Sequence, residues 1–512
     1  MLNALTASFS NHFSKDFLAS IVVFLVALPL CLGIAIASGM PPTAGIVTGI
    51  IGGIIVGAMS GSQLTVSGPA AGLVVLVAEI LSVYGAAMLG LILLLACLVQ
   101  LVAGALRLGV WFRAISPAVI HGMLAGIGIL IIGSQFHIML DRTPLTNGIQ
   151  NLVDIPNALI ETIAHHGGNL DAAFIGLLTI GAIILWARFA PQKLKLIPGA
   201  LVGVLLAILL ANGLNLDVKF LSEMFEEPAS ISTLFDLSIP SLDHIANSLN
   251  GGVLLAVISL AFIASAETLL SVAAVDKMHQ GPRAKYDREL MAQGVGNTLC
   301  GMLGALPMTG VIVRSSTNVQ AGARTRKSTI MHGTWLLLFV GIFLFTLQYI
   351  PVATLAAVLV YTGYKLAYPK VAKELLAYGK AELAIYIITM ATIVCFDLLT
   401  GVVTGLVLSL AKLIYIFAHV AVKIERRSPD GNIIVHLKGS ATFLGLPKLA
   451  TALENLTRGR AVSIQFDDLE YIDHACIELL DNWQKQYVMT GGSVQIHWDS
   501  LMSKYHQQNG RS

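Results

Sequence analysis

The sequence predicts an all-α polytopic membrane protein with a small α/β domain at its C-terminal end. Three observations carry this prediction. Hydrophobic residues make up 56% of the 512 residues and charged residues only 12%, a composition typical of membrane proteins. Long apolar segments recur as far as about residue 423, and the loops between them alternate in basic charge. In the remaining residues, patterns typical of strands and of helices alternate.

Fourteen membrane spans can be drawn on the apolar segments, because each full span needs about 20 mainly apolar residues. The third and the tenth are interpreted as half-helices that follow extended chain. The first span follows Lys15 without a small-residue cleavage site, which indicates a retained helix. The expected boundaries are 16–38, 42–60, 64–82, 85–106, 115–138, 172–189, 196–212, 250–275, 290–304, 310–322, 328–348, 352–368, 383–399 and 400–423.

The loop charges support this count independently. Cytoplasmic loops are enriched in Lys and Arg, so a cytoplasmic N-terminus places the basic loops after the even-numbered spans. The odd-numbered loops carry only Arg142 and Lys219. The even-numbered loops carry Arg107, Arg113, Arg188, Lys193, Lys195, Lys277, Arg283, Lys285, Arg288, Arg324, Arg326, Lys327, Lys365, Lys370, Lys373 and Lys380. Both termini are therefore predicted to be cytoplasmic.

Each half of the apolar region carries one segment broken by Gly and Pro, third in order in spans 1–7 and in spans 8–14. These are residues 60–77, with Pro69 at the break, and residues 304–327, with Pro307 at the break. Paired breaks in corresponding positions are typical of inverted-repeat transporters, whose site lies between them. An odd number of spans in each half inverts the second repeat. The alternative is that the two prolines merely kink packed helices.

An arginine follows the second break directly. A guanidinium at membrane depth is costly and is expected to face a wet cavity or a partner, and a helix that begins there adds free N–H groups and a positive dipole. The sequence therefore predicts a site for a small anion within the bilayer. The predicted anion-binding residues are Arg314, Ser315, Ser316, Thr65, Ser67, Gly68 and Ala70. Helix packing is the alternative role for the arginine and the hydroxyls.

Glu267 lies in the middle of the eighth span, where a carboxylate is functional by default. Ser271 follows four residues later and shares its helix face. Three roles stay open for Glu267: binding Na⁺ with Ser271 and carbonyl groups of the tenth span, exchanging a proton, or pairing with Arg314. Asp276 and Lys277, at the inner end of this span, are interpreted as a pair that faces an interface or a loop.

Several functional classes are excluded. The net charge of +2 and the absence of a basic–aromatic patch argue against nucleic acid. The five cysteines are scattered without metal-ligand spacing, which indicates buried free thiols. No nucleotide loop, nucleophile elbow or metal constellation stands out, so an enzyme is not expected. No cofactor is expected either, apart from Na⁺ as a coupling ion.

The composition becomes more polar after Lys423. We expect a transmembrane anion-transport domain over 1–425, a linker over 426–431 and a cytoplasmic domain over 432–512. The last domain is predicted to have a mixed sheet. Its expected strands are 432–439, 461–469 and 493–498, and its expected helices are 446–456 and 476–488.

Two motifs resemble the SulP family of anion transporters: LPMTGVIVRSSTNVQAGARTRKS (306–328) and QLTVSGPAAGL (63–73). The resemblance implies a 7+7 inverted repeat of the UraA-like kind, in which a core domain moves against a gate domain. It also implies an anion held between the N-termini of spans 3 and 10, and a homodimer. The C-terminal domain resembles the family's STAS domain. There Asp473 precedes His474 and Ala475 rather than a phosphorylatable serine, which favours a structural or dimerising role.

Within that family, PLCLGIAIASG (29–39) and SAETLLSVAAVDK (265–277) resemble a bacterial branch associated with carbonic anhydrases. This implies bicarbonate uptake across the bacterial inner membrane. The eighth span is also similar to that of a cyanobacterial bicarbonate transporter, where an acidic residue and a hydroxyl four positions later help to bind sodium. Glu267 and Ser271 match them. That transporter has no arginine at the position of Arg314, whereas many other members do.

The expected function is therefore secondary active uptake of a small inorganic oxyanion, with bicarbonate first and Na⁺ or H⁺ as the coupling ion. A sulfate or dicarboxylate proton symporter, or an anion exchanger, is the alternative, and a channel-like anion conductor is a more distant one. A nucleobase transporter of the same architecture would carry paired carboxylates on spans 8 and 10. Span 10 carries Arg314 instead.

Overall fold

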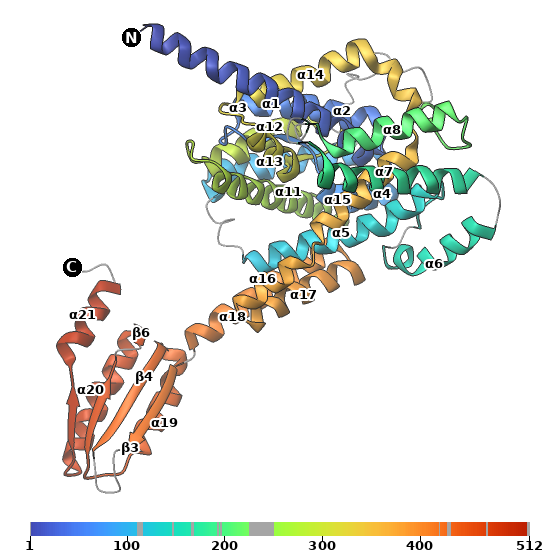
Figure 1. Ribbon diagram of the computed structural model, residues 1–512. Helices are drawn as coiled ribbons and strands as arrows, with labels where there is room; N and C mark the ends of the chain where they lie inside the picture. The colour runs from blue at the N-terminus through green and yellow to red at the C-terminus, as the bar shows by residue number, and fades with distance from the viewer. Residues whose placement is uncertain are drawn as a thin grey trace. The chain divides into compact units, whose positions relative to one another are not determined.

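A computed structural model describes residues 2–109, 116–145, 148–164, 168–191, 194, 197–224, 250–418, 420–426, 432–466 and 469–508. The chain divides into two compact units, Met1–Gly405 and Leu406–Ser512. In the described residues, the first unit is almost entirely helical and the second combines helices with a sheet (Figure 1).

The helices of the first half are α1 (Leu2–Ala37), α2 (Pro42–Ile51), η1 (Gly52–Val56), α3 (Gly57–Met59), η2 (Ala71–Leu73), α4 (Val74–Ala105), α5 (Pro117–Met139), α6 (Gly148–Ala164), α7 (Gly168–Phe189), α8 (Gly199–Gly213) and η4 (Leu221–Met224). Those of the second half are α11 (Gly251–Met278), α12 (Tyr286–Met302), α13 (Ile312–Gln320), α14 (Lys327–Phe343), η5 (Leu344–Tyr349), α15 (Val352–Leu366), α16 (Lys370–Ala377), α17 (Lys380–Cys395) and α18 (Leu398–Ala418).

Seven helices of the described residues are long and apolar enough to cross a membrane. They are Phe13–Ala37, Pro42–Met59, Ala71–Ala105, Pro117–Met139, Leu170–Phe189, Gly251–Met278 and Leu398–Phe417. Only 17% of the apolar window of the last is buried within the protein, against 72% for Pro42–Met59. Outward apolar faces of this kind suit contact with lipid. The other expected spans coincide with shorter or broken helices, so the count of fourteen stays a prediction.

The break expected between spans 3 and 4 falls at Gly85. Its φ is 80° and its ψ is 171°, inside the long helix α4, a conformation that glycine adopts without steric cost. Two further helices, α6 and α16, lie outside the expected spans. Both mix polar with apolar residues, and a search for apolar runs therefore passes over them.

The two broken segments meet as a pair of short antiparallel strands, β1 (Ser67–Pro69) and β2 (Met308–Gly310). Ser67 lies opposite Gly310, and Pro69 lies opposite Met308. Each strand leads into a helix within two residues, β1 into η2 and α4, and β2 into α13. Because the strands are antiparallel, the helices leave the pair in opposite directions and both begin beside it.

The helices of the first unit pack in two sets. A core set contains α1–α4 and α11–α14, in which α12 packs on α4, α1 on α14 and α11 on α4 (Figure 1). An outer set contains α5–α8 and α15–α17, in which α5 packs on α15 and α17, and α7 on α8. Each set draws on both halves of the sequence, and the β1–β2 pair belongs to the core set.

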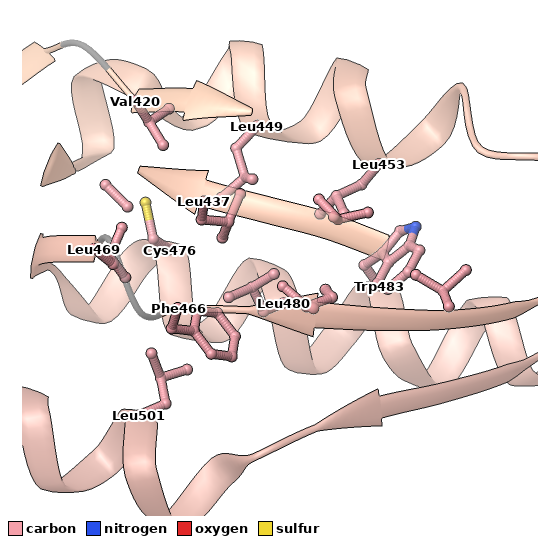
Figure 2. Packing of buried hydrophobic residues seen from close by; sticks show 14 of the residues in the cluster. Val420, Leu437, Leu449, Leu453, Phe466, Leu469, Cys476, Leu480, Trp483 and Leu501 are labelled. Atoms are coloured by element: carbon pink, nitrogen blue, oxygen red, sulfur yellow. The ribbon is translucent and has the colours of Figure 1, made fainter. Parts of the chain in front are cut away.

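The second unit is an α/β fold with a mixed sheet, as the sequence predicts. Its strands are β3 (Val420–Arg426), β4 (Ile433–Ala441), β5 (Ala461–Gln465), β6 (Leu469–Ile472) and β7 (Ser493–Ile496). Its helices are α19 (Leu446–Glu454), α20 (His474–Met489) and α21 (Trp498–Gln508). β3 is antiparallel to β4, and the other pairs are parallel. Figure 2 shows the core, where Leu437 and Phe466 of the sheet region face Leu480 and Trp483 of α20.

Sequence analysis missed the first strand of this sheet. β3 takes residues that were expected in the last span and at the start of the linker, and it pairs with β4 from Val420↔Gly439 to Arg426↔Ile433. In the sequence, only one polar residue, His419, separates the apolar run of α18 from Val420, Ala421 and Val422, so hydropathy alone does not mark the end of the helix. Asp473 accepts a hydrogen bond from the Cys476 N–H (2.9 Å) and caps α20, which agrees with a structural role.

Candidate functional site

Ser315 ties the two broken segments together. Its Oγ accepts a hydrogen bond from the Val66 N–H (2.9 Å) and donates one to the Val311 carbonyl (2.7 Å). The Val311 N–H in turn donates to the Val66 carbonyl (2.9 Å). The serine is fully buried, so these bonds substitute for water at the crossing of the two strands.

The other predicted hydroxyls also bind protein groups. Thr65 donates to Ser62 Oγ (2.7 Å), and Ser67 Oγ accepts from Gln293 Nε2 (2.7 Å). Ser316 donates to the carbonyl of Val313 within its own helix (3.0 Å). These three side chains therefore hold the local backbone in place in the structure.

Arg314 lies fully buried behind the strand pair. Its Nη1 lies against Gly68, where any Cβ would overlap it, and its Nη2 is 3.5 Å from the Pro69 carbonyl oxygen. Within the described residues, Nε and Nη1 have no hydrogen-bond partner. The guanidinium thus places a positive charge next to both helix starts, and no carboxylate is paired with it in the described part of the chain.

A cavity of about 640 Å³ separates the core set from the outer set. Ala71 and Gly72 of η2 line it, as do Ile312 and Val313 of α13. The first N–H groups of a helix have no partner within that helix, and the positive end of its dipole lies there. Two helix starts therefore meet one cavity, as the paired breaks predict. The outer set contributes residues of α5 and α15, among them Pro117, His121, Thr362 and Leu366.

The predicted residues divide between this cavity and the packing behind it. Glu267 and Ser271 line the cavity. Thr65, Ser67, Gly68, Ala70, Arg314, Ser315 and Ser316 are not among its described lining residues and lie next to it, in or beside the strand pair. From the two broken segments, the residues that follow each strand line the cavity.

The Glu267 carboxylate lies against the start of η2. A Cβ built on Gly72 would be 2.6 Å from Oε2 and 2.8 Å from Oε1 of Glu267. Oε2 is buried and has no hydrogen-bond partner among the described residues. No ion pair joins Glu267 to Arg314 in that part of the chain. Because Glu267 lines the cavity and its Oε2 has no partner in that part of the chain, a cation or a proton from the cavity can reach this oxygen.

Asp276 and Lys277, which were expected as a pair at the inner end of α11, have different surroundings. Asp276 accepts hydrogen bonds from the Ala284 N–H (3.2 Å) and so faces the loop, as expected. Lys277 lines the cavity instead, beside the exposed Met278. One helical position turns the side chain by about 100°, which suffices to bring it from the loop to the cavity.

Sequence analysis missed several polar residues that hold the site. Thr268, next to Glu267, accepts a hydrogen bond from the Gly310 N–H (3.1 Å). On α12, Glu289, Gln293 and Asn297 are buried and bind groups of both broken segments. The signal available in the sequence was their four-residue spacing, which places them on one face of α12.

Comparison with known proteins supports this architecture. The model of the Sulfate permease family matches residues 13–389. A putative sulfate transporter, YvdB of Bacillus subtilis, is 29% identical over 411 residues, which cover 78% of this chain and 73% of that protein. The bicarbonate transporter BicA of a Picosynechococcus species is 24% identical over 405 residues, covering 76% and 68%. The structure of SLC26A9 shares the fold with a TM-score of 0.72 at 15% identity, over 98% of this chain and 88% of that one.

Proposed function

This chain belongs to the sulfate permease family, and on that premise we propose that it takes up bicarbonate by secondary active transport coupled to Na⁺ or H⁺. Members of the family are transporters of small anions in membranes, not enzymes. One observation carries the proposal: a single cavity meets two helix starts and an unpaired carboxylate. An oxyanion would bind the helix starts and the coupling cation would bind the carboxylate.

The anion would sit at the backbone N–H groups after β1 and β2, near Ala70, Ala71 and Val313. Helix N-termini bind oxyanions through such groups without a dedicated side chain. Arg314 would add its field from behind the strand pair, at short range and in a medium of low dielectric constant. Thr65, Ser67, Gly68, Ser315 and Ser316 would shape the two segments so that their N–H groups converge on the anion.

Glu267 and Ser271 would bind the coupling ion, because both line the cavity and share one face of α11. Carboxylate, hydroxyl and carbonyl oxygens are the ligands that hard cations prefer. A proton on Glu267 is the alternative form of the same coupling. In either form, the cation would neutralise a carboxylate that lies beside the anion, so that both bind together more readily than either alone.

The proposed topology has fourteen spans as a 7+7 inverted repeat, with core and gate domains that correspond to the core and outer sets. The inverted halves explain why the two strands run antiparallel and why each leads into a helix. Both termini would lie in the cytoplasm of a bacterial cell, the protein would lie in the inner membrane, and residues 432–512 would form a cytoplasmic STAS-like domain. We propose a homodimer as the assembled form.

The test is uptake of labelled bicarbonate by proteoliposomes, with and without an inward Na⁺ gradient at fixed pH, and with and without an inward H⁺ gradient in the absence of Na⁺. The proposal predicts saturable uptake that an inward Na⁺ or H⁺ gradient stimulates. Labelled sulfate and a dicarboxylate are measured in parallel. Uptake of sulfate alone would replace bicarbonate as the substrate, and YvdB, named as a putative sulfate transporter, makes sulfate the second candidate.

A further inference from the structure

We propose that Glu289, Gln293 and Asn297 form a polar ladder on α12 that sets the positions of both helix starts and thereby the affinity for the anion. The inference rests on the proposed function and assigns positioning residues to its site. All three side chains are buried, and none lines the cavity among the described residues. They would act through the backbone segments that they hold.

Glu289 holds the chain before β1. Its Oε2 accepts hydrogen bonds from Ser60 Oγ (2.5 Å) and from the Ser62 N–H (3.0 Å). Ser62 Oγ in turn accepts from Thr65 (2.7 Å), two residues before the strand. A buried carboxylate with charge-assisted bonds of this kind fixes its partners strongly.

Gln293 holds β1 itself, one helical turn further along. Its Nε2 donates to Ser67 Oγ (2.7 Å) and to Glu289 Oε1 (3.2 Å). The amide thus joins the first rung of the ladder to a residue of the strand. Loss of the amide would leave Ser67 Oγ without this donor and one side of the strand unsupported.

Asn297 holds β2, which belongs to the other half of the sequence. Its Oδ1 accepts from the Met308 N–H (2.8 Å), and its Nδ2 donates to the Met308 carbonyl (3.3 Å) and to Gln100 Oε1 (2.9 Å). Gln100 Nε2 donates in turn to Ser265 Oγ (3.2 Å) on α11. The network therefore reaches the helix that carries Glu267.

The spacing of the ladder explains why one helix can do this. Residues four apart lie on one face of a helix, about 6 Å from each other along its axis. In order along α12, the three side chains therefore contact the chain before β1, then β1 itself, and then β2. A rigid helix that holds both strands fixes the separation of the two N-termini, and two-point binding of a small anion depends on that separation.

The first experiment compares Gln293→Leu with Gln135→Leu in the full chain. Gln135 is likewise buried, but it lies on α5 of the outer set, whereas the strand pair belongs to the core set. For the substrate anion, we expect Gln293→Leu to raise KM about tenfold while kcat changes about twofold or less. Gln135→Leu should leave KM unchanged. A wild-type KM in Gln293→Leu, with only a lower Tm, would reduce the ladder to a packing feature and overturn the proposal.

A double-mutant cycle tests whether Gln293 acts through Ser67. If it does, Gln293→Leu combined with Ser67→Ala should have the KM of one single variant, because both changes remove the same contact. Multiplicative effects on KM would contradict the proposed route. Asn297→Leu should raise KM independently, since it releases β2 rather than β1.

Hydrogen–deuterium exchange separates this proposal from the proposed function. Gln293→Leu should speed exchange in residues 65–69, and Asn297→Leu in residues 306–310, each about tenfold relative to the wild type. If wild-type protein takes up none of the tested anions, the proposed function fails, and hydrogen exchange alone tests whether the ladder holds the two segments. Unchanged exchange in both segments would overturn it.

Discussion

The two broken segments share a backbone and differ in chemistry. Each has a three-residue strand that contains a glycine, Gly68 or Gly310, and each leads into a helix that begins at the cavity. Only the second segment carries charged residues, with Arg314 beside the strand pair, whereas the first lies against the carboxylate of Glu267 from α11. The main chain therefore forms the same geometry twice, whereas the charges beside it differ in sign and come from different helices, Arg314 from α13 and Glu267 from α11.

The largest expected effect comes from removing the shared glycine geometry. Gly68→Ala places a Cβ where Arg314 Nη1 lies, so the guanidinium or the strand must move. We expect uptake to fall at least about tenfold and the free energy of unfolding to fall by about 1–3 kcal/mol. Gly181→Ala on α7, where a Cβ meets open space, is the control in uptake and thermal-unfolding assays. Normal uptake by Gly68→Ala would show that transport does not depend on the close approach of Arg314 to this glycine.

Removing the negative charge beside the first segment should abolish coupling. Glu267→Gln keeps the shape of the side chain but no longer binds Na⁺ as an anion or takes up a proton. Uptake should lose its stimulation by either gradient, while exchange of labelled for unlabelled anion continues. The exposed Glu79→Gln on α4 is the control. Gradient-driven uptake at the wild-type rate in Glu267→Gln would leave a packing role for this carboxylate.

Removing the positive charge behind the second segment should weaken binding more than folding. Arg314→Gln is expected to raise KM about tenfold, which corresponds to about 1.4 kcal/mol, with little change in Tm, because Nε and Nη1 have no partner among the described residues. Arg324→Gln, in an exposed loop position, is the control. An unchanged KM would remove Arg314 from the site.

The smallest effects separate two neighbouring serines. Ser315→Ala removes a hydroxyl that bridges Val66 and Val311, and it should lower the free energy of unfolding by about 1–3 kcal/mol. Ser316→Ala removes a bond within one helix turn and should change KM and Tm less than Ser315→Ala does. Equal behaviour of the two variants in thermal unfolding would show that the strand crossing does not depend on Ser315.

The sequence predicted those parts of the fold and site that leave a local signal. Breaks at Pro69 and Pro307 predicted two half-helices, and the carboxylate of Glu267 in an apolar span predicted a residue of the cavity. Which side of a segment faces the cavity depends on tertiary packing. Thus the sequence did not reveal that Ser67 binds Gln293, or that Lys277 lines the cavity while Asp276 faces the loop. β3 was missed because the apolar residues at its start follow the apolar run of α18 after a single polar residue.

We propose that the anion binds at the two helix starts, and protection of engineered cysteines from chemical modification can detect it there. Cys395 is the exposed one of the five cysteines and is first replaced by serine. Ala71→Cys and Val313→Cys place thiols at the two helix starts, and Leu366→Cys places one on the outer wall of the cavity. A negatively charged methanethiosulfonate then reacts with purified protein, with and without saturating bicarbonate.

We expect bicarbonate to slow modification of Ala71→Cys and Val313→Cys alike and to leave the modification rate of Leu366→Cys unchanged. If the protein transports bicarbonate but bicarbonate changes the modification rate at neither helix start, the anion does not bind there.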